Sequence, residues 1–72
     1  MYFNLKSAMS AENITINDLA AVINTHRNSV RNKINGEAPW LYEEAEKIQN
    51  TFFRKYTLSW LFYKVVEEEV NV

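Results

Sequence analysis

Apolar residues recur along the chain at helical spacing, in stretches separated by short polar breaks. The alternation that is typical of strands is sparse, and one glycine and one proline leave few interruptions. The pattern therefore predicts an all-α fold of about five helices. The expected helices cover residues 4–12, 16–23, 25–35 and 41–51, with a fifth that begins near residue 58.

Residues with strong preferences for helix ends support these limits. Thr15 is placed to cap the second helix, with Asp18 three positions later as in a capping box. Asn13 and Asn24 follow the first and second helices, where a left-handed conformation is expected. Gly36 follows the third helix and is a standard C-terminal signal. Thr57 precedes the fifth helix as an N-cap residue.

One apolar face from each helix is expected to form a single small core, because 72 residues allow one domain. We assign residues 1–66 to this domain and residues 67–72 to an acidic C-terminal tail. The fifth helix is expected to turn one apolar face inward, which extends to Val65 and Val66. Phe52 is expected in the core as well. The other predicted core residues are Leu5, Met9, Leu19, Ala20, Ile23, Val30, Ile34, Ala45, Ile48, Leu58, Leu61 and Phe62.

The third helix differs from the others because it carries few apolar side chains. Val30 and Ile34 share one side and are expected to dock this helix on the second one. The rest of its surface offers arginine, asparagine and lysine, and no acid occurs between residues 19 and 36. A face that is merely solvated usually includes acids. Arg and Asn are the side chains best shaped to read purine edges in a DNA major groove, so the pattern favours DNA binding.

The overall charge of −1 is unusual for a nucleic-acid-binding protein, which is commonly basic. Arg27, Arg31 and Lys33 lie close together on the third helix, so the acids are concentrated elsewhere. Salt screens such distant acids beyond about 8–10 Å. One basic face on an acidic body is therefore compatible with binding DNA at short range.

Two segments together resemble the phage repressor and Cro family of helix-turn-helix proteins, also called the XRE family. They are ITINDLAAVINTHRNSVRNKING at residues 14–36 and FFRKYTLSWLF at residues 52–62. The resemblance covers about residues 4–62. It implies a five-helix bundle of the lambda repressor-like DNA-binding type, with the helix-turn-helix at residues 15–36 and its second helix in the major groove.

The resemblance also implies roles for particular residues. Arg27, Asn28 and Asn32 match base-reading positions, and we add Arg31, which lies beside them and can reach a base or a phosphate. The expected contacts to the DNA backbone are Thr15, Asn17, His26, Lys33, Asn35 and Gly36. Two departures from the family pattern lower the expected phosphate affinity. Ile16 stands where the family often has glutamine, and the loop at residues 37–40 is EAPW rather than basic.

A homodimer is expected, since one weak half-site contact gains affinity when two are read together. The second half of the chain holds more large aromatics than a small core can hide. The resemblance places the dimer contact at the end of the fifth helix, which assigns it to Trp60 and Tyr63. The expected function is a transcriptional regulator, a phage Cro-like repressor that binds operator DNA in the cytoplasm of a bacterial host.

Other classes of function lack the residues they need. With no cysteine and one histidine, neither a metal site nor a Ser–His–Asp arrangement is expected, and one glycine excludes a glycine-rich phosphate loop. We expect no enzyme activity, cofactor or small-molecule ligand, and no membrane span or signal peptide. Two alternatives stay open. One is a protein-interaction module, such as an antirepressor or adaptor, that keeps the fold without DNA binding, and the other is an excisionase-like architectural factor.

Overall fold

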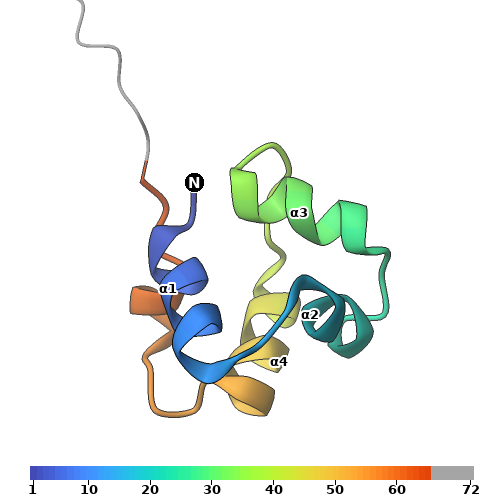
Figure 1. Cartoon of the computed structure of the whole chain (residues 1–72). Coiled ribbons are helices and arrows are strands. Elements are labelled where there is room, and N and C mark those ends of the chain that lie inside the picture. Colours follow the sequence, from blue (N-terminus) through green and yellow to red (C-terminus); the bar gives the residue numbers. More distant parts are fainter. Residues whose placement is uncertain (66–72) are drawn as a thin grey trace, which may run out of the picture.

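The computed structural model describes residues 1–65, which form five α-helices and no strand. The helices are α1 (Phe3–Glu12), α2 (Ile16–Val22), α3 (Arg27–Asn35), α4 (Tyr42–Phe52) and α5 (Leu58–Leu61). Figure 1 shows α1 beside the short α5 on one side of the molecule and the α2–α3 pair on the other. Helix α4 lies between these groups and contacts both α2 and α5. The predicted all-α fold is confirmed for the described residues.

The predicted helix ends are confirmed at most positions. The Asp18 backbone N–H donates to the Thr15 hydroxyl at 3.2 Å, and the Thr15 N–H donates to the Asp18 carboxylate at 2.8 Å, which is a complete capping box. Asn13 (φ 57°) and Asn24 (φ 54°) both adopt the left-handed conformation. Gly36 ends α3 with φ 85°.

Helix α3 begins two residues later than expected, at Arg27 instead of residue 25. The Thr25 N–H donates to the Ala20 carbonyl at 2.9 Å, so Thr25 belongs to the turn that closes α2. His26 then serves as the N-cap: its Nδ1 atom accepts the Asn28 backbone N–H at 3.1 Å. A residue in the closing turn of one helix cannot also start the next.

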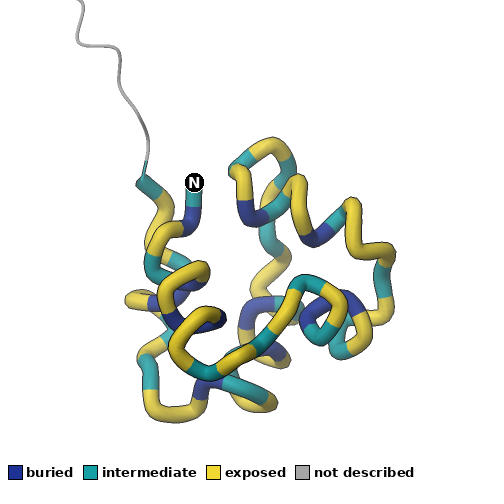
Figure 2. Tube along the Cα trace, viewed as in Figure 1, coloured by how far each residue is buried: buried dark blue, intermediate teal, exposed yellow. Residues whose placement is uncertain are grey.

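The buried residues cluster where the five helices meet (Figure 2). Of the predicted core, the following residues are buried: Leu5, Met9, Leu19, Ala20, Val30, Ile34, Ala45, Ile48 and Leu61. Ile23, Leu58 and Phe62 are only half-buried, so their full burial was wrongly predicted. They pack against the rim of the cluster instead.

Phe53 is completely buried, whereas Phe52, which was expected in the core, is half-buried. The spacing of Ala45 and Ile48 favours Phe52 as the next core position, but α4 ends there. Phe53 leaves the helix with φ −130°, which redirects its side chain. Helical periodicity thus selects the wrong phenylalanine where the helix stops.

Two further buried residues come from α1 and its start. Ala8 lies on the α1 stripe, and Tyr2 precedes the helix. The Tyr2 ring packs edge-on against Trp40 and Phe62, with ring centroids 6.4 and 6.3 Å apart. An aromatic residue outside a helix has no periodicity that would have predicted this burial.

Helix α5 stops at Leu61, so Val65 does not share its apolar face as expected. The Val65 N–H donates instead to the Met1 carbonyl at 3.0 Å, and the Met1 nitrogen donates to the Val65 carbonyl at 3.0 Å. The two segments therefore run side by side (Figure 1). Val66 and the predicted acidic tail at residues 67–72 lie outside the described residues. Within the described range, no helix is long and apolar enough to cross a membrane.

Candidate nucleic-acid interface

The face of α3 that carries Arg and Asn is exposed to solvent. Val30 and Ile34 are buried and fix the orientation of α3 on the core. The four predicted base-reading residues all lie on the exposed surface; they are Arg27, Asn28, Arg31 and Asn32. Their spacing of one, three and four residues puts them on adjoining sides of one helix. The burial of Val30 and Ile34 confirms the helix phase on which this face was predicted.

The arginines of this face keep their charge available. Within residues 1–65, the ion pairs are Lys33 with Glu44 and Lys55 with Glu12, and neither involves Arg27 or Arg31. The hydrogen bond from the Glu12 carboxylate raises the pKa of the Lys55 ammonium, which lies on the α1–α4 side of the molecule. The acids thus neutralise cations away from the exposed face of α3.

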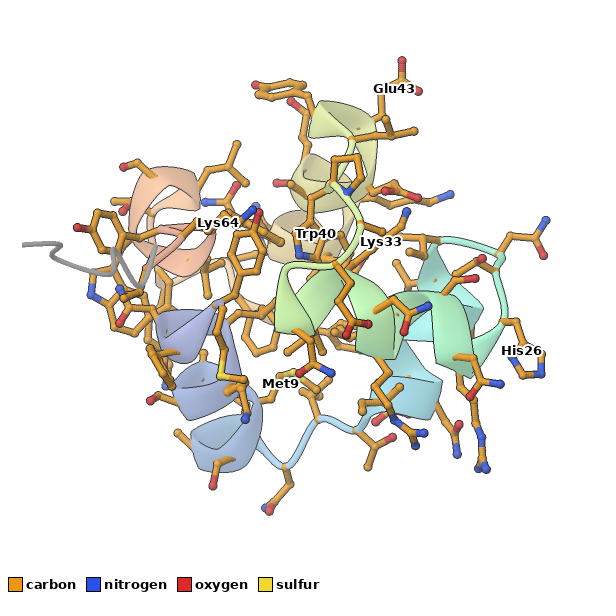
Figure 3. All side chains as sticks on the ribbon, turned by 90° about the horizontal axis from the view of Figure 1, so that it is seen from above. Met9, His26, Lys33, Trp40, Glu43 and Lys64 are labelled. Carbon is orange, nitrogen blue, oxygen red and sulfur yellow. The ribbon has the colours of Figure 1, made fainter. Side chains whose placement is uncertain are left out.

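His26 lies at the exposed start of α3 (Figure 3). Because its Nδ1 atom accepts the Asn28 N–H, the proton of a neutral His26 is assigned to Nε2. The Nε2–H is therefore a hydrogen-bond donor at the end of the helix that also carries Arg27. This geometry allows His26 to contact a phosphate without being protonated.

The start of α2 is less open to an anion than predicted. The Thr15 hydroxyl donates to the Asp18 carboxylate at 3.0 Å and also accepts the Asp18 N–H, so the capping box occupies it. The Asp18 carboxylate adds a negative charge where a phosphate was expected. Asn17 is exposed and remains available at this end of α2.

Lys33 is directed away from the predicted DNA contact. Its ammonium donates to both carboxylate oxygens of Glu44 on α4, and the two side chains are only 14% and 16% exposed. The same nitrogen lies 5.7 Å from the centre of the Trp40 ring. The structure therefore gives Lys33 an interhelical role and leaves its charge neutralised (Figure 3).

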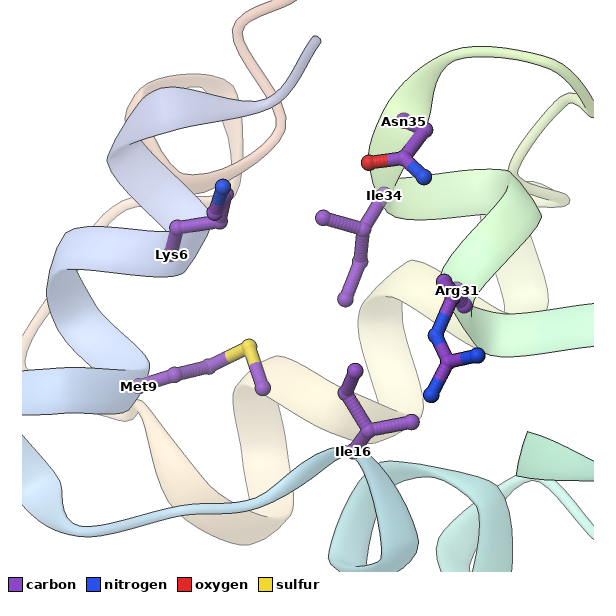
Figure 4. Close-up of a pocket in the computed structure, with 6 residues that line it drawn as sticks. All are labelled: Lys6, Met9, Ile16, Arg31, Ile34 and Asn35. Carbon is purple, nitrogen blue, oxygen red and sulfur yellow. The ribbon is translucent and has the colours of Figure 1, made fainter. Parts of the chain in front are cut away.

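Asn35 and Arg31 line a cleft between α3 and α1 (Figure 4). Lys6 of α1 lies across the cleft, and the apolar floor is built from Met9, Ile16 and Ile34. Ile16, the departure from the family pattern, thus serves as part of this floor. Sequence reasoning did not single out Lys6, since nothing in the order of residues indicates that α1 passes beside the end of α3.

The two aromatic residues predicted at a dimer contact have different surroundings. Tyr63 is 61% exposed, whereas Trp60 is 41% exposed and stacks on Tyr56 with ring centroids 5.1 Å apart. A second apolar surface was not predicted. Leu41 and Tyr42 are both largely exposed, at a groove between α4 and α5 that Trp40, Leu58 and Phe62 also line. Its signal in the sequence is the apolar run that follows Pro39.

No protein-family model, curated protein or solved structure matches this chain. The argument for function therefore depends on the side chains and their geometry. Among the described residues, no cluster of histidine and acids could hold a metal ion.

The arrangement on α3 is suited to recognition of a polar, anionic surface. The helix presents two guanidinium groups and three amides, and the amides can each donate and accept hydrogen bonds. With about 1.5 Å of rise per residue, its nine residues span about 13 Å, close to the roughly 12 Å width of a B-DNA major groove.

Proposed function

We propose that this protein is a sequence-specific regulator of transcription that binds double-stranded DNA through α3, as a Cro-like repressor of the lambda repressor-like fold. The observation that carries the proposal is the exposed, acid-free Arg/Asn face of α3, held by the burial of Val30 and Ile34. The compact α2–α3 pair supports it, because helix-turn-helix proteins present the second helix of such a pair to the groove.

Recognition divides between bases and backbone. Arg27 and Arg31 can each donate two hydrogen bonds to the O6 and N7 atoms of guanine, and Asn28 and Asn32 can pair in the same way with adenine. Asn17, His26 and Asn35 donate to phosphates on either side. Lys33 takes no part, because Glu44 holds its ammonium between α3 and α4.

The protein acts as a homodimer in this proposal. A dimer reads two half-sites about 34–36 Å apart, which compensates for the weak phosphate binding of one copy. The contact is assigned to Trp60 and Tyr63, whose exposed aromatic surface is the type that interfaces bury. Occupation of a promoter by the dimer blocks transcription in the cytoplasm of a bacterial host.

One observation favours a second candidate, a protein-interaction module on the same helices. The groove between α4 and α5, with Leu41 and Tyr42 exposed beside it, is an apolar surface far larger than single scattered residues require. An adaptor or antirepressor would use this surface and would make no selective contact with DNA.

Selection of bound duplexes from a random pool distinguishes the two candidates. The repressor proposal expects enrichment of a pseudo-palindromic sequence, which should also occur in the DNA upstream of the protein's own coding sequence. Affinity for the enriched duplex should fall steeply with salt, as phosphate contacts require. The adaptor proposal expects no enriched sequence at any salt concentration, and that result would refute the proposed function.

A further inference from the structure

Two lysines remote in the sequence lie near the C-terminal end of α3. Lys6 on α1 lines the cleft that Arg31 and Asn35 line from α3 (Figure 4). The Lys64 side chain lies over Gly36: its Cε and Nζ atoms are 3.4 and 3.8 Å from the position that a Cβ atom on Gly36 would occupy. The last turn of α3 is thus flanked by two cations that do not belong to α3 or to the loop after it.

Backbone hydrogen bonds hold both lysines near this end of α3. The Tyr2 N–H donates to the Ile34 carbonyl at 3.1 Å, which anchors the start of α1 on the last turn of α3. The Val65 N–H donates to the Met1 carbonyl, so the segment that carries Lys64 is attached to the same place. Because Gly36 has no side chain, the aliphatic part of Lys64 can lie directly over it.

Both lysines are exposed, and neither forms an ion pair within residues 1–65. Lys33 provides a contrast, since Glu44 neutralises it although it belongs to α3. The loop that follows Gly36 contributes no cation, only Glu37. Positive charge at this end of α3 therefore comes from α1 and from residue 64.

We propose that Lys6 and Lys64 bind phosphates of the DNA backbone beside the groove that α3 enters. The proposal rests on the proposed function and adds the residues that supply its missing phosphate contacts. With Arg31 between them on α3, the two ammonium groups flank a part of the surface where a backbone can pass while Arg27 and Asn28 face the bases. Contacts of this kind add affinity at every sequence and read none.

Charge-removing variants test the proposal by the salt dependence of binding. Lys6→Gln and Lys64→Gln are compared with Lys47→Gln, an exposed lysine on α4 whose loss changes the net charge equally. Affinity for the selected duplex is measured by fluorescence anisotropy over a range of salt concentrations. Each of the two variants should reduce the slope of log affinity against log salt by about 0.9, while Lys47→Gln leaves it unchanged.

Two further measurements separate a lost phosphate contact from a damaged fold. Circular dichroism should show that all three variants remain folded, and Lys6→Arg and Lys64→Arg should restore the wild-type slope, since both keep the charge. The preferred base at each position should stay the same in the glutamine variants.

The outcomes separate this inference from the proposed function. If the wild type selects no sequence, the proposed function fails. If the wild type selects a sequence but Lys6→Gln and Lys64→Gln keep its salt slope, or change the slope no more than Lys47→Gln does, the phosphate contacts are refuted and the function stands.

Discussion

The Lys33 ammonium donates hydrogen bonds to both carboxylate oxygens of Glu44, and this pair joins α3 to α4. Both side chains are largely buried, so neither charge is well solvated without the other. The pair makes Lys33 part of the scaffold that supports α3, although its place in the sequence suggested a contact with DNA.

Lys33→Gln should therefore lower the free energy of unfolding by about 1–3 kcal/mol, because it leaves the Glu44 carboxylate without its charged partner. Urea denaturation measures this loss. The salt slope of DNA binding by the folded variant should match that of the wild type. A reduced slope with unchanged stability would show that Lys33 contacts phosphate after all.

The two adjacent phenylalanines after Thr51 should differ in their contribution to stability. Phe53→Ala should destabilise the fold by about 3–5 kcal/mol, since it opens a cavity in the fully buried core. Phe52→Ala removes a half-buried ring and should cost less. Thermal denaturation of both variants provides the comparison, and equal losses would contradict the burial described for this pair.

Trp60→Lys should leave the helices intact and prevent occupation of both half-sites together. The added charge would lie in the proposed dimer contact, where burial of an unpaired ammonium is unfavourable. Sedimentation and footprinting on the selected duplex measure the effect. The control is Tyr42→Lys, which places the same charge on the other apolar surface. If Tyr42→Lys alone abolishes paired occupancy, the dimer forms through the groove between α4 and α5.

The sequence predicts local features well where a short-range rule governs them. The capping box of Thr15 and Asp18 and the left-handed conformations of Asn13 and Asn24 all depend on neighbours within a few residues. Helical periodicity likewise separates the buried Val30 from the exposed Arg31.

Features that depend on distant segments are not predicted in this way. The pairing of Lys33 with Glu44 requires the angle between α3 and α4, and the position of Lys64 over Gly36 requires the return of the chain to Met1. Phe53 enters the core only because α4 ends one residue earlier. The candidate site was thus predictable on α3 itself, and its surroundings were not.

The central claim is that the exposed face of α3 reads DNA sequence. The most direct test compares the base preferences of the wild type with those of Arg27→Ala and Asn32→Ala, measured on duplexes that vary one position of the selected site. Each variant should lose about 1–3 kcal/mol of discrimination at one base pair in each half-site and keep the preferences elsewhere. Equal affinity of the wild type and both variants for the selected and random duplexes would contradict the claim.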